Sequence, residues 1–294
     1  MVADLLSTLE DERPVQIAGV VNAYSAMLAE RAGFRALYVS GSGVATASFG
    51  LPDLGLTSLT EVAEDTRRIA GATDLPILVD ADTGWGGPMM VERTVRELGR
   101  AGAAAIQIED QVTEKRCGHR PNKRLIDPEL MEAKVRAAAN ARPEPAFRIV
   151  ARTDALAVTG REDAIARARR YAAAGADVLF LEAPENLSDY QAISAAAPVP
   201  VLANITEFGR TPLFTVAELA AAGVSFALYP LSAHRAMAAA ATAVFDAIRA
   251  GGTQQGVLET MQTRDELYQV LDYQRWEGRM DRYAELLGEA PLPN

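Results

Sequence analysis

Eight short apolar runs alternate with longer stretches rich in alanine, arginine and glutamate, and this alternation constrains the fold more than any other feature of the chain. The runs have the composition of buried β-strands, and the stretches between them are long enough for helices. Eight such units are typical of a closed (β/α)₈ barrel of the TIM type, with an open doubly wound sheet as the alternative. The runs are VQIAGVV (15–21), ALYVS (36–40), PILVDAD (76–82), AAIQIED (104–110), FRIVART (147–153), VLFLEA (178–183), PVLANI (200–205) and FALYP (226–230).

Glycine and proline mark the borders of these units in a regular way. Each even-numbered run follows a glycine, which suits the left-handed residue that ends a helix. Each odd-numbered run is introduced by a proline, which stops a helix and favours extended backbone. The pattern predicts a βαβα unit repeated four times without an internal domain boundary. The glycines are Gly33, Gly102, Gly175 and Gly223, and the prolines are Pro14, Pro76, Pro145 and Pro200.

The chain is therefore expected to form a single domain over residues 1–294. Residues 1–13 are predicted to be an N-terminal helix, 14–250 the barrel, and 251–294 a C-terminal helical extension. Apolar residues recur at helical spacing in this extension, from Val257 to Trp276. An apolar helix face beyond a complete barrel must be covered, and we expect a neighbouring subunit to cover it.

Charge and cysteine content exclude several classes of protein. The formal net charge of -10 argues against nucleic-acid binding through a general positive surface. The single cysteine excludes an intramolecular disulfide, and no signal peptide is recognised at the N-terminus. No apolar run approaches the roughly 20 residues that span a bilayer. We therefore expect a cytoplasmic protein without a transmembrane segment.

Acidic residues gather at the expected carboxyl ends of the strands, where barrels of this kind carry their active sites. Asp80, Asp82 and Glu109 are expected to converge there, because residues two apart share one face of a strand. Oxygen ligands without histidine or cysteine favour Mg²⁺ or Mn²⁺ over Zn²⁺. For one acid alone, helix capping or an arginine partner is the better explanation, but convergence favours a metal. Asp53 either joins this site through water or caps a turn.

Other candidate residues suit an anionic substrate. Arg152 ends a strand, and a guanidinium group binds carboxylates in a bidentate manner. The stretch from Ser40 through Gly41 to Ser42 offers hydroxyl and backbone N–H donors, although it is too short for a nucleotide-binding loop.

The only cysteine, Cys117, lies between Lys115-Arg116 and Gly118-His119. Neighbouring positive charge lowers the pKa of a thiol, so this position suits a cysteine that exchanges protons or attacks a substrate. A buried structural cysteine is the alternative. His119 either tunes Cys117 or bonds its neighbours in the loop.

The segment KRCGH (115–119) resembles the signature of the isocitrate lyase and methylisocitrate lyase family. The resemblance to the methylisocitrate lyase branch extends over nearly the whole chain, in long motifs that occur in the same order. These motifs are YVSGSGVA (38–45), GLPDLGL (50–56), VDADTGWG (79–86), QIEDQ (107–111), KRCGHRPNK (115–123), ARTDA (151–155), LEAPE (181–185), NITEFG (204–209), ALYPLSA (227–233) and TMQTR (260–264).

The resemblance implies a Mg²⁺-dependent carbon–carbon lyase that cleaves 2-methylisocitrate to pyruvate and succinate in the methylcitrate cycle of propionate catabolism. It also implies a barrel whose eighth helix is exchanged between subunits of a homotetramer. The implied metal positions are Asp80 and Asp82, with Asp53 and Glu109 contributing through water. The implied substrate contacts are Ser40, Gly41, Ser42, Cys117, Gly118, Arg152, Glu182, Asn204, Ile205, Thr206, Arg235 and Arg264.

A retro-aldol cleavage needs a base for the substrate hydroxyl and an acid for the carbanion. We predict Tyr38 as the base and Cys117 as the acid, with Glu182 and His119 as further catalytic residues. The long loop from Gln111 to Arg124 is expected to act as a lid.

Three alternatives remain. Isocitrate lyases share the cysteine motif, but they usually carry insertions and a Ser/Pro-rich counterpart of residues 204–209. Phosphoenolpyruvate mutases and oxaloacetate decarboxylase-like enzymes share the barrel and lack KRCGH. A non-catalytic anion-binding barrel is the alternative from another class.

Overall fold

A computed structural model describes residues 4–288 of the chain. Two compact units make up the chain, Met1–Arg235 and Ala236–Asn294. The first unit is a closed barrel of parallel strands in sequence order, in which the last strand pairs with the first. This confirms the barrel and excludes the open sheet. Its strands are β1 (Val15–Val20), β2 (Ala36–Val39), β3 (Ile77–Asp80), β4 (Ala105–Glu109), β5 (Arg148–Thr153), β6 (Val178–Leu181), β7 (Val201–Asn204) and β8 (Phe226–Tyr229).

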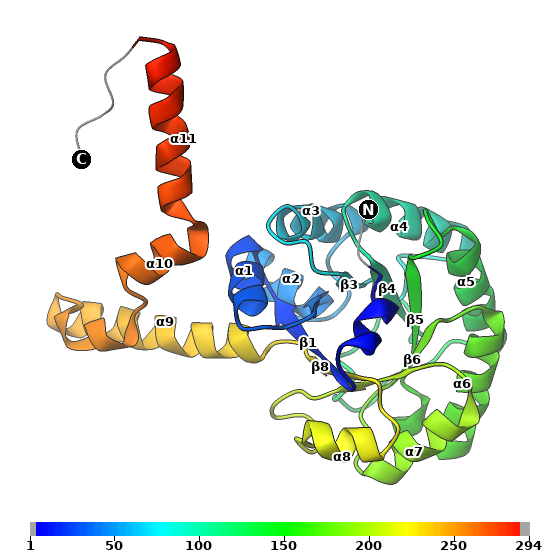
Figure 1. The fold of residues 1–294 in the computed structure, drawn as a ribbon. Coiled ribbons are helices and arrows are strands. Elements are labelled where there is room, and N and C mark those ends of the chain that lie inside the picture. Colours follow the sequence, from blue (N-terminus) through cyan, green and yellow to red (C-terminus); the bar gives the residue numbers. More distant parts are fainter. Residues whose placement is uncertain (1–3, 289–294) are drawn as a thin grey trace. The chain divides into compact units, whose positions relative to one another are not determined.

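Helices follow the strands and surround the barrel (Figure 1). Two helices lie between β2 and β3, and a short 3-10 helix, η2 (Ala155–Ala157), follows β5. The helices of this unit are α1 (Ala23–Arg31), α2 (Gly41–Phe49), α3 (Leu59–Ala70), α4 (Pro88–Arg100), α5 (Pro128–Asn140), α6 (Arg161–Ala174), α7 (Leu187–Ala196) and α8 (Val216–Ala221).

Glycine ends the helices before the even-numbered strands, as the sequence predicts. Gly33, Gly102, Gly175 and Gly223 all have positive φ angles, between 81° and 113°. A residue with a side chain is strained in this conformation, so glycine lets the chain turn sharply from each helix into the next strand.

The core has two parts that follow the alternation of side chains along each strand. One set of strand residues packs with helix residues such as Val62 and Val91 and therefore faces outward. The alternate set, which includes Ile17, Tyr38 and Phe180, forms a separate buried cluster and fills the interior of the barrel.

The N-terminal segment closes this interior cluster. Leu5 and Leu9 belong to the cluster and are buried. The predicted helix over residues 1–13 is shorter than expected, a 3-10 helix, η1, that spans Leu6–Glu10. Residues 1–3 lie outside the described part.

The second unit continues α9 (Ser232–Gly251) and adds η3 (Gln255–Thr260), α10 (Arg264–Leu271) and α11 (Tyr273–Leu286). The helical character predicted for the C-terminal extension is thus confirmed for its described residues, up to residue 288. In residues 4–288 no helix combines the length and the hydrophobicity that crossing a bilayer would require. The assignment of residues 1–294 to one domain stays a prediction.

Candidate active site

The polar residues at the strand ends continue the inward-facing set of the barrel. Tyr38 and Phe180 lie in the interior cluster. Side chains two residues apart share a face, so Glu182 is expected to point to the same side as Phe180. The same parity applies to the other strands, where Asp80 follows Leu78 and Arg152 follows Val150. The carboxyl end of the barrel therefore gathers ionisable groups in a buried place.

Asp80 and Asp82 come together beside the N-terminus of α2. Asp80 Oδ2 accepts a hydrogen bond from the backbone N–H of Gly41 at 3.1 Å, and its Oδ1 accepts one from the N–H of Asp82 at 3.0 Å. A Cβ atom at Gly41 would lie 2.9 Å from Asp82 Oδ1 and 3.3 Å from Asp80 Oδ2. Both carboxylates thus approach one point, and only a residue without a side chain fits there. Asp82 lies beyond β3 in a left-handed turn, with φ 47°.

Tyr38 is linked to this pair through Gln107. Its hydroxyl donates to Gln107 Oε1 at 2.7 Å, and Gln107 Nε2 donates to Asp80 Oδ1 at 3.2 Å. Burial raises the pKa of Tyr38 well above its ordinary value, and the charge of Asp80 raises it further. In this arrangement Tyr38 is a hydrogen-bond donor, and its role as the base stays a prediction.

Lys115 brings the loop of residues 111–124, which carries Cys117 and is called the cysteine loop below, to the same acids. Its Nζ lies 2.5 Å from Asp82 Oδ1 and 2.7 Å from Asp53 Oδ1, and its side chain is buried. Burial lowers the pKa of this lysine, but Asp82, Glu109 and Asp53 outweigh burial and hold the pKa well above its ordinary value. Sequence reasoning missed this contact, although the signal was available. Two of the three lysines of the chain, Lys115 and Lys123, lie within the predicted lid.

Arg152 is the cation that lies among the acids at the carboxyl end of the barrel, which is called the barrel mouth below. Its Nε lies 2.9 Å from Asp154 Oδ2 and 3.3 Å from Glu109 Oε2, and its terminal nitrogen Nη2 lies 3.4 Å from Glu182 Oε1. The guanidinium carbon lies 5.2 Å from the centre of the Phe180 ring. One arginine thus neutralises several buried acids, and its planar fork suits a substrate carboxylate.

Glu109 is the least satisfied of these acids. Neither of its carboxylate oxygens accepts a hydrogen bond within the described residues, and its side chain is buried. Burial raises the pKa of Glu109 well above its ordinary value, against the lowering effect of Arg152 and Lys115. A buried carboxylate without donors needs a further partner, which a water, a cation or a substrate group supplies.

The Cys117 thiol has a raised pKa, so the predicted lowering is wrong. Burial raises it most, the backbone N–H of His119 lowers it, and the charges of Asp53 and Glu182 raise it. The neighbouring cations do not act on the sulfur as expected, because Lys115 turns to Asp53 and Asp82 and Arg116 is exposed. Cys117 therefore remains a protonated thiol at neutral pH, which suits a proton donor better than a nucleophile.

The segment after Cys117 packs on the Arg152–Glu182 pair. A Cβ atom at Gly118 would lie 1.9 Å from Glu182 Oε1 and 2.4 Å from Arg152 Nη2. His119 Nδ1 accepts from the backbone N–H of Arg210, and its Nε2 lies 3.4 Å from Glu182 Oε1. Burial lowers the pKa of His119, so the neutral ring carries its proton on Nε2, toward Glu182.

A family model described as phosphoenolpyruvate phosphomutase matches residues 5–249, which include the whole barrel and this mouth. The chain belongs to the phosphoenolpyruvate phosphomutase family. Within this family it is 54% identical to the 2-methylisocitrate lyase of Salmonella typhimurium over 276 residues, 94% of each chain. It is 53% identical to the 2-methylisocitrate lyase of Escherichia coli over 276 residues, 94% of this chain and 93% of that one.

Solved structures of the same superfamily share the fold. A 2,3-dimethylmalate lyase matches with a TM-score of 0.86 and 35% identity, covering 98% of this chain and 97% of that one. A phosphonopyruvate hydrolase in complex with oxalate and Mg²⁺ matches with a TM-score of 0.83 and 30% identity, covering 95% and 97%. The phosphoenolpyruvate phosphomutase family thus includes enzymes that act on different small acids.

The remaining predicted residues of this family member fall into three groups. Asn204 Nδ2 donates to Glu182 Oε2 at 3.3 Å and so joins the mouth, while its Oδ1 accepts no hydrogen bond within the described residues. Ile205 has the opposite parity, and its side chain packs in the layer between barrel and helices. Ser40, Ser42 and Thr206 lie at the same strand ends, where Ser40 and Thr206 are buried and Ser42 is half-buried.

Two further predicted substrate contacts, Arg235 and Arg264, rest mainly on the family resemblance. Arg235 pairs with Glu207 at 3.6 Å, and its guanidinium carbon lies 5.7 Å from the centre of the Phe208 ring. Arg264 begins α10 in the second unit. Their predicted contacts with substrate stay predictions.

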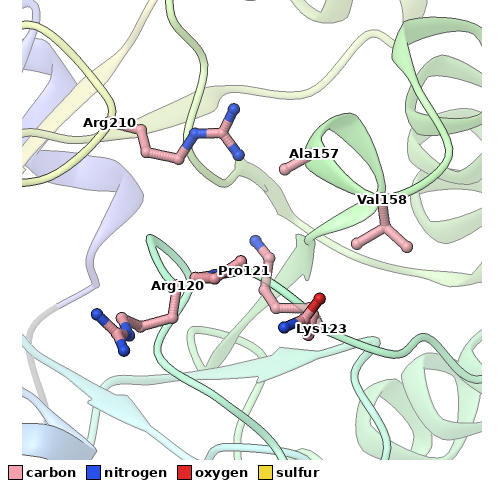
Figure 2. Close-up of a pocket in the computed structure, with 7 residues that line it drawn as sticks. Arg120, Pro121, Lys123, Ala157, Val158 and Arg210 are labelled. Carbon is pink, nitrogen blue, oxygen red and sulfur yellow. The ribbon is translucent and has the colours of Figure 1, made fainter.

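Lys123 fixes the far end of the cysteine loop. Its Nζ donates to Gly118 O at 2.5 Å and to Asp154 Oδ1 at 2.7 Å. The same residue lines a pocket of about 220 Å³, and Arg210 lies across this pocket from it (Figure 2). Three of the seven lining residues are basic and none is acidic. Two of these basic residues are paired with acids outside the lining, because Lys123 contacts Asp154 and Arg210 contacts Glu185.

Proposed function

We propose that the protein is a lyase that cleaves 2-methylisocitrate to pyruvate and succinate in the methylcitrate cycle. One observation carries this proposal. The Asp80–Asp82 pair, the buried Arg152 and the loop with the protonated thiol of Cys117 converge at one barrel mouth. Relatives named 2-methylisocitrate lyase, aligned over nearly the whole chain, support it.

The acids of the mouth fit a divalent cation bound with help from water and substrate. Within residues 4–288 no three His, Cys, Asp or Glu side chains form a ready cluster for a metal ion. Mg²⁺ does not require one, because it is usually held by one or two carboxylates together with waters and substrate oxygens. The ammonium group of Lys115 between Asp53 and Asp82 indicates that a cation is accommodated there. We infer that Asp80 and Asp82 hold Mg²⁺ or Mn²⁺, with Asp53 and Glu109 acting through water.

The bound cation would supply Lewis-acid stabilisation of the oxygen charge that develops on the pyruvate half. The guanidinium group of Arg152 is positioned to hold a substrate carboxylate in a bidentate manner. The ring of Phe180 packs against this guanidinium group. The substrate hydroxyl loses its proton to a base at the barrel mouth as the pyruvate carbonyl forms, and the electron pair of the broken carbon–carbon bond stays on the succinate half. The Cys117 thiol donates its proton to that carbon, and Gly118 and His119 hold the loop over the Glu182 side.

The test is a product assay with two substrates. We expect pyruvate release from 2-methylisocitrate to exceed glyoxylate release from isocitrate by about tenfold or more, because a pocket shaped for the additional methyl group discriminates by roughly that factor. Pyruvate is measured with lactate dehydrogenase and glyoxylate as its phenylhydrazone, with Mg²⁺ and with EDTA. Asp82→Asn is the control that removes the cation ligand. Excess glyoxylate would move the assignment to isocitrate lyase, and turnover unaffected by EDTA would contradict the metal.

We also propose that the protein assembles as a homotetramer. Its eighth barrel helix, which is α9 because it follows β8, would be exchanged between subunits. No described residue of α9, α10 or α11 is buried. Large apolar side chains are exposed on these helices, among them Phe245, Trp276 and Met280. Such surfaces are normally covered. Light scattering should give about four times the chain mass, and a monomer would contradict the assembly.

A further inference from the structure

The ammonium group of Lys115 contacts Asp82, one of the two acids proposed to hold the cation. It lies 2.5 Å from Asp82 Oδ1 and 2.7 Å from Asp53 Oδ1. Lys115 precedes Cys117 by two residues in the loop that follows β4. A single side chain thus connects the acids of the barrel mouth with the segment that carries the thiol.

We propose that Lys115 is a positioning residue that holds the cysteine loop on Asp53 and Asp82 until a divalent cation displaces its ammonium group. The inference rests on the proposed function, because it takes Asp82 as a ligand of that cation. Lys115 would then compete with the metal for Asp82, and metal binding would be coupled to the position of Cys117.

The competition follows from distance and charge. A Mg²⁺ ion lies about 2.0–2.1 Å from a carboxylate oxygen. An ammonium group 2.5 Å from the same oxygen would then lie at most about 4.6 Å from a doubly charged ion. The side chain of Lys115 is buried, so little water screens this repulsion. The two cations therefore exclude one another at Asp82.

The coupling follows from the way the loop is held. Lys115 anchors it before Cys117, and Lys123 anchors it after Cys117 through Gly118 O and Asp154. Release of Lys115 removes the contact with the acids, while Gln111 still bonds the backbone of Arg116 and the second anchor stays in place. Cys117 then gains mobility while the loop stays attached to the barrel mouth.

Mutual exclusion must appear from both sides, because linkage between two binding events is reciprocal. Removing the charge of Lys115 should tighten the binding of the metal, and adding the metal should loosen the loop. A lysine with a merely structural role would give neither effect. Its removal would leave metal affinity unchanged or, through disturbed acids, weaken it.

The experiment measures Mn²⁺ affinity and Cys117 reactivity in the substrate-free, full-length protein. Lys115→Met should bind Mn²⁺ about tenfold more tightly than the native chain in calorimetric titration. Alkylation of Cys117, the only cysteine, should become faster in the native chain when Mn²⁺ is added. In Lys115→Met it should already be fast and should not respond to Mn²⁺.

Two variants serve as controls. Arg116→Met removes the adjacent, exposed charge and should behave as the native chain does. Lys115→Arg keeps a positive charge and should keep the weaker Mn²⁺ affinity. Mn²⁺ affinity in Lys115→Met that is equal to or weaker than that of the native chain would overturn the inference, as would alkylation that ignores Mn²⁺ in the native chain. The pyruvate assay on the native chain separates this failure from a failure of the proposed function.

Discussion

Replacing Cys117 with serine is expected to lower kcat for pyruvate release by about a thousandfold, with a much smaller change in KM. The serine hydroxyl has nearly the same size, so the loop and its anchors should be kept. It is a far weaker acid than the thiol, and the nascent succinate carbanion then lacks its proton donor. Steady-state kinetics measure the effect, and unchanged Mn²⁺ affinity and melting temperature show that the variant is folded.

The pH profile of the native chain gives an independent readout of the same role. The active form carries the thiol proton, so activity is kept below the thiol pKa and falls as the pH rises through it. Burial raises this pKa, which places the loss of activity above the ordinary titration range of cysteine. Cys117→Ser should lack this alkaline loss. Full turnover in the serine variant would remove Cys117 from the reaction.

The barrel could be predicted from the sequence because its signals are local. Each signal acts within a few residues: the apolar runs, the prolines before the odd-numbered strands and the glycines at four helix ends. The positive φ angles of these glycines agree with the predicted helix ends. The parity of each strand then identifies which residues face inward. Asp80 and Glu182 could therefore be assigned to the mouth before any distance was known.

The sequence misled where the outcome depends on contacts between distant segments. Lys115 precedes Cys117 closely in the chain, yet its charge is taken up by Asp53 and Asp82, so burial decides the pKa of the thiol. Tyr38 faces inward as expected, but its hydroxyl donates a hydrogen bond to Gln107, and burial together with the nearby acids raises its pKa. Neither effect is encoded by spacing along one strand.

Replacing Arg152 with methionine is expected to abolish measurable turnover and to lower the free energy of unfolding by about 3–5 kcal/mol. Methionine fills most of the space but leaves Glu109 and Glu182 without the guanidinium charge and leaves Asp154 with only one of its two cations. The cost arises mainly from these buried acids. Urea unfolding measures the loss of stability. Lys123 still pairs with Asp154 and therefore limits this loss.

The pH dependence of this loss identifies its cause. Burial raises the pKa of Glu109, and Arg152 lowers it, so the pKa rises further when the arginine is removed. A carboxyl whose folded-state pKa exceeds its unfolded value destabilises the fold at higher pH, and this cost disappears as the pH falls through the raised pKa. The deficit of Arg152→Met should therefore shrink as the pH falls below the raised pKa of Glu109 toward the ordinary titration range of glutamate.

Arg152→Lys separates charge from geometry in the same position. The ammonium group neutralises the acids, so most of the stability should return, but a single point charge does not reproduce the bidentate fork. Turnover should stay about a hundredfold below that of the native chain. A stability deficit of Arg152→Met that is constant with pH would show that lost packing, such as the contact with Phe180, outweighs the uncompensated charge. Native turnover in Arg152→Lys would show that substrate binding needs only a positive charge at the barrel mouth.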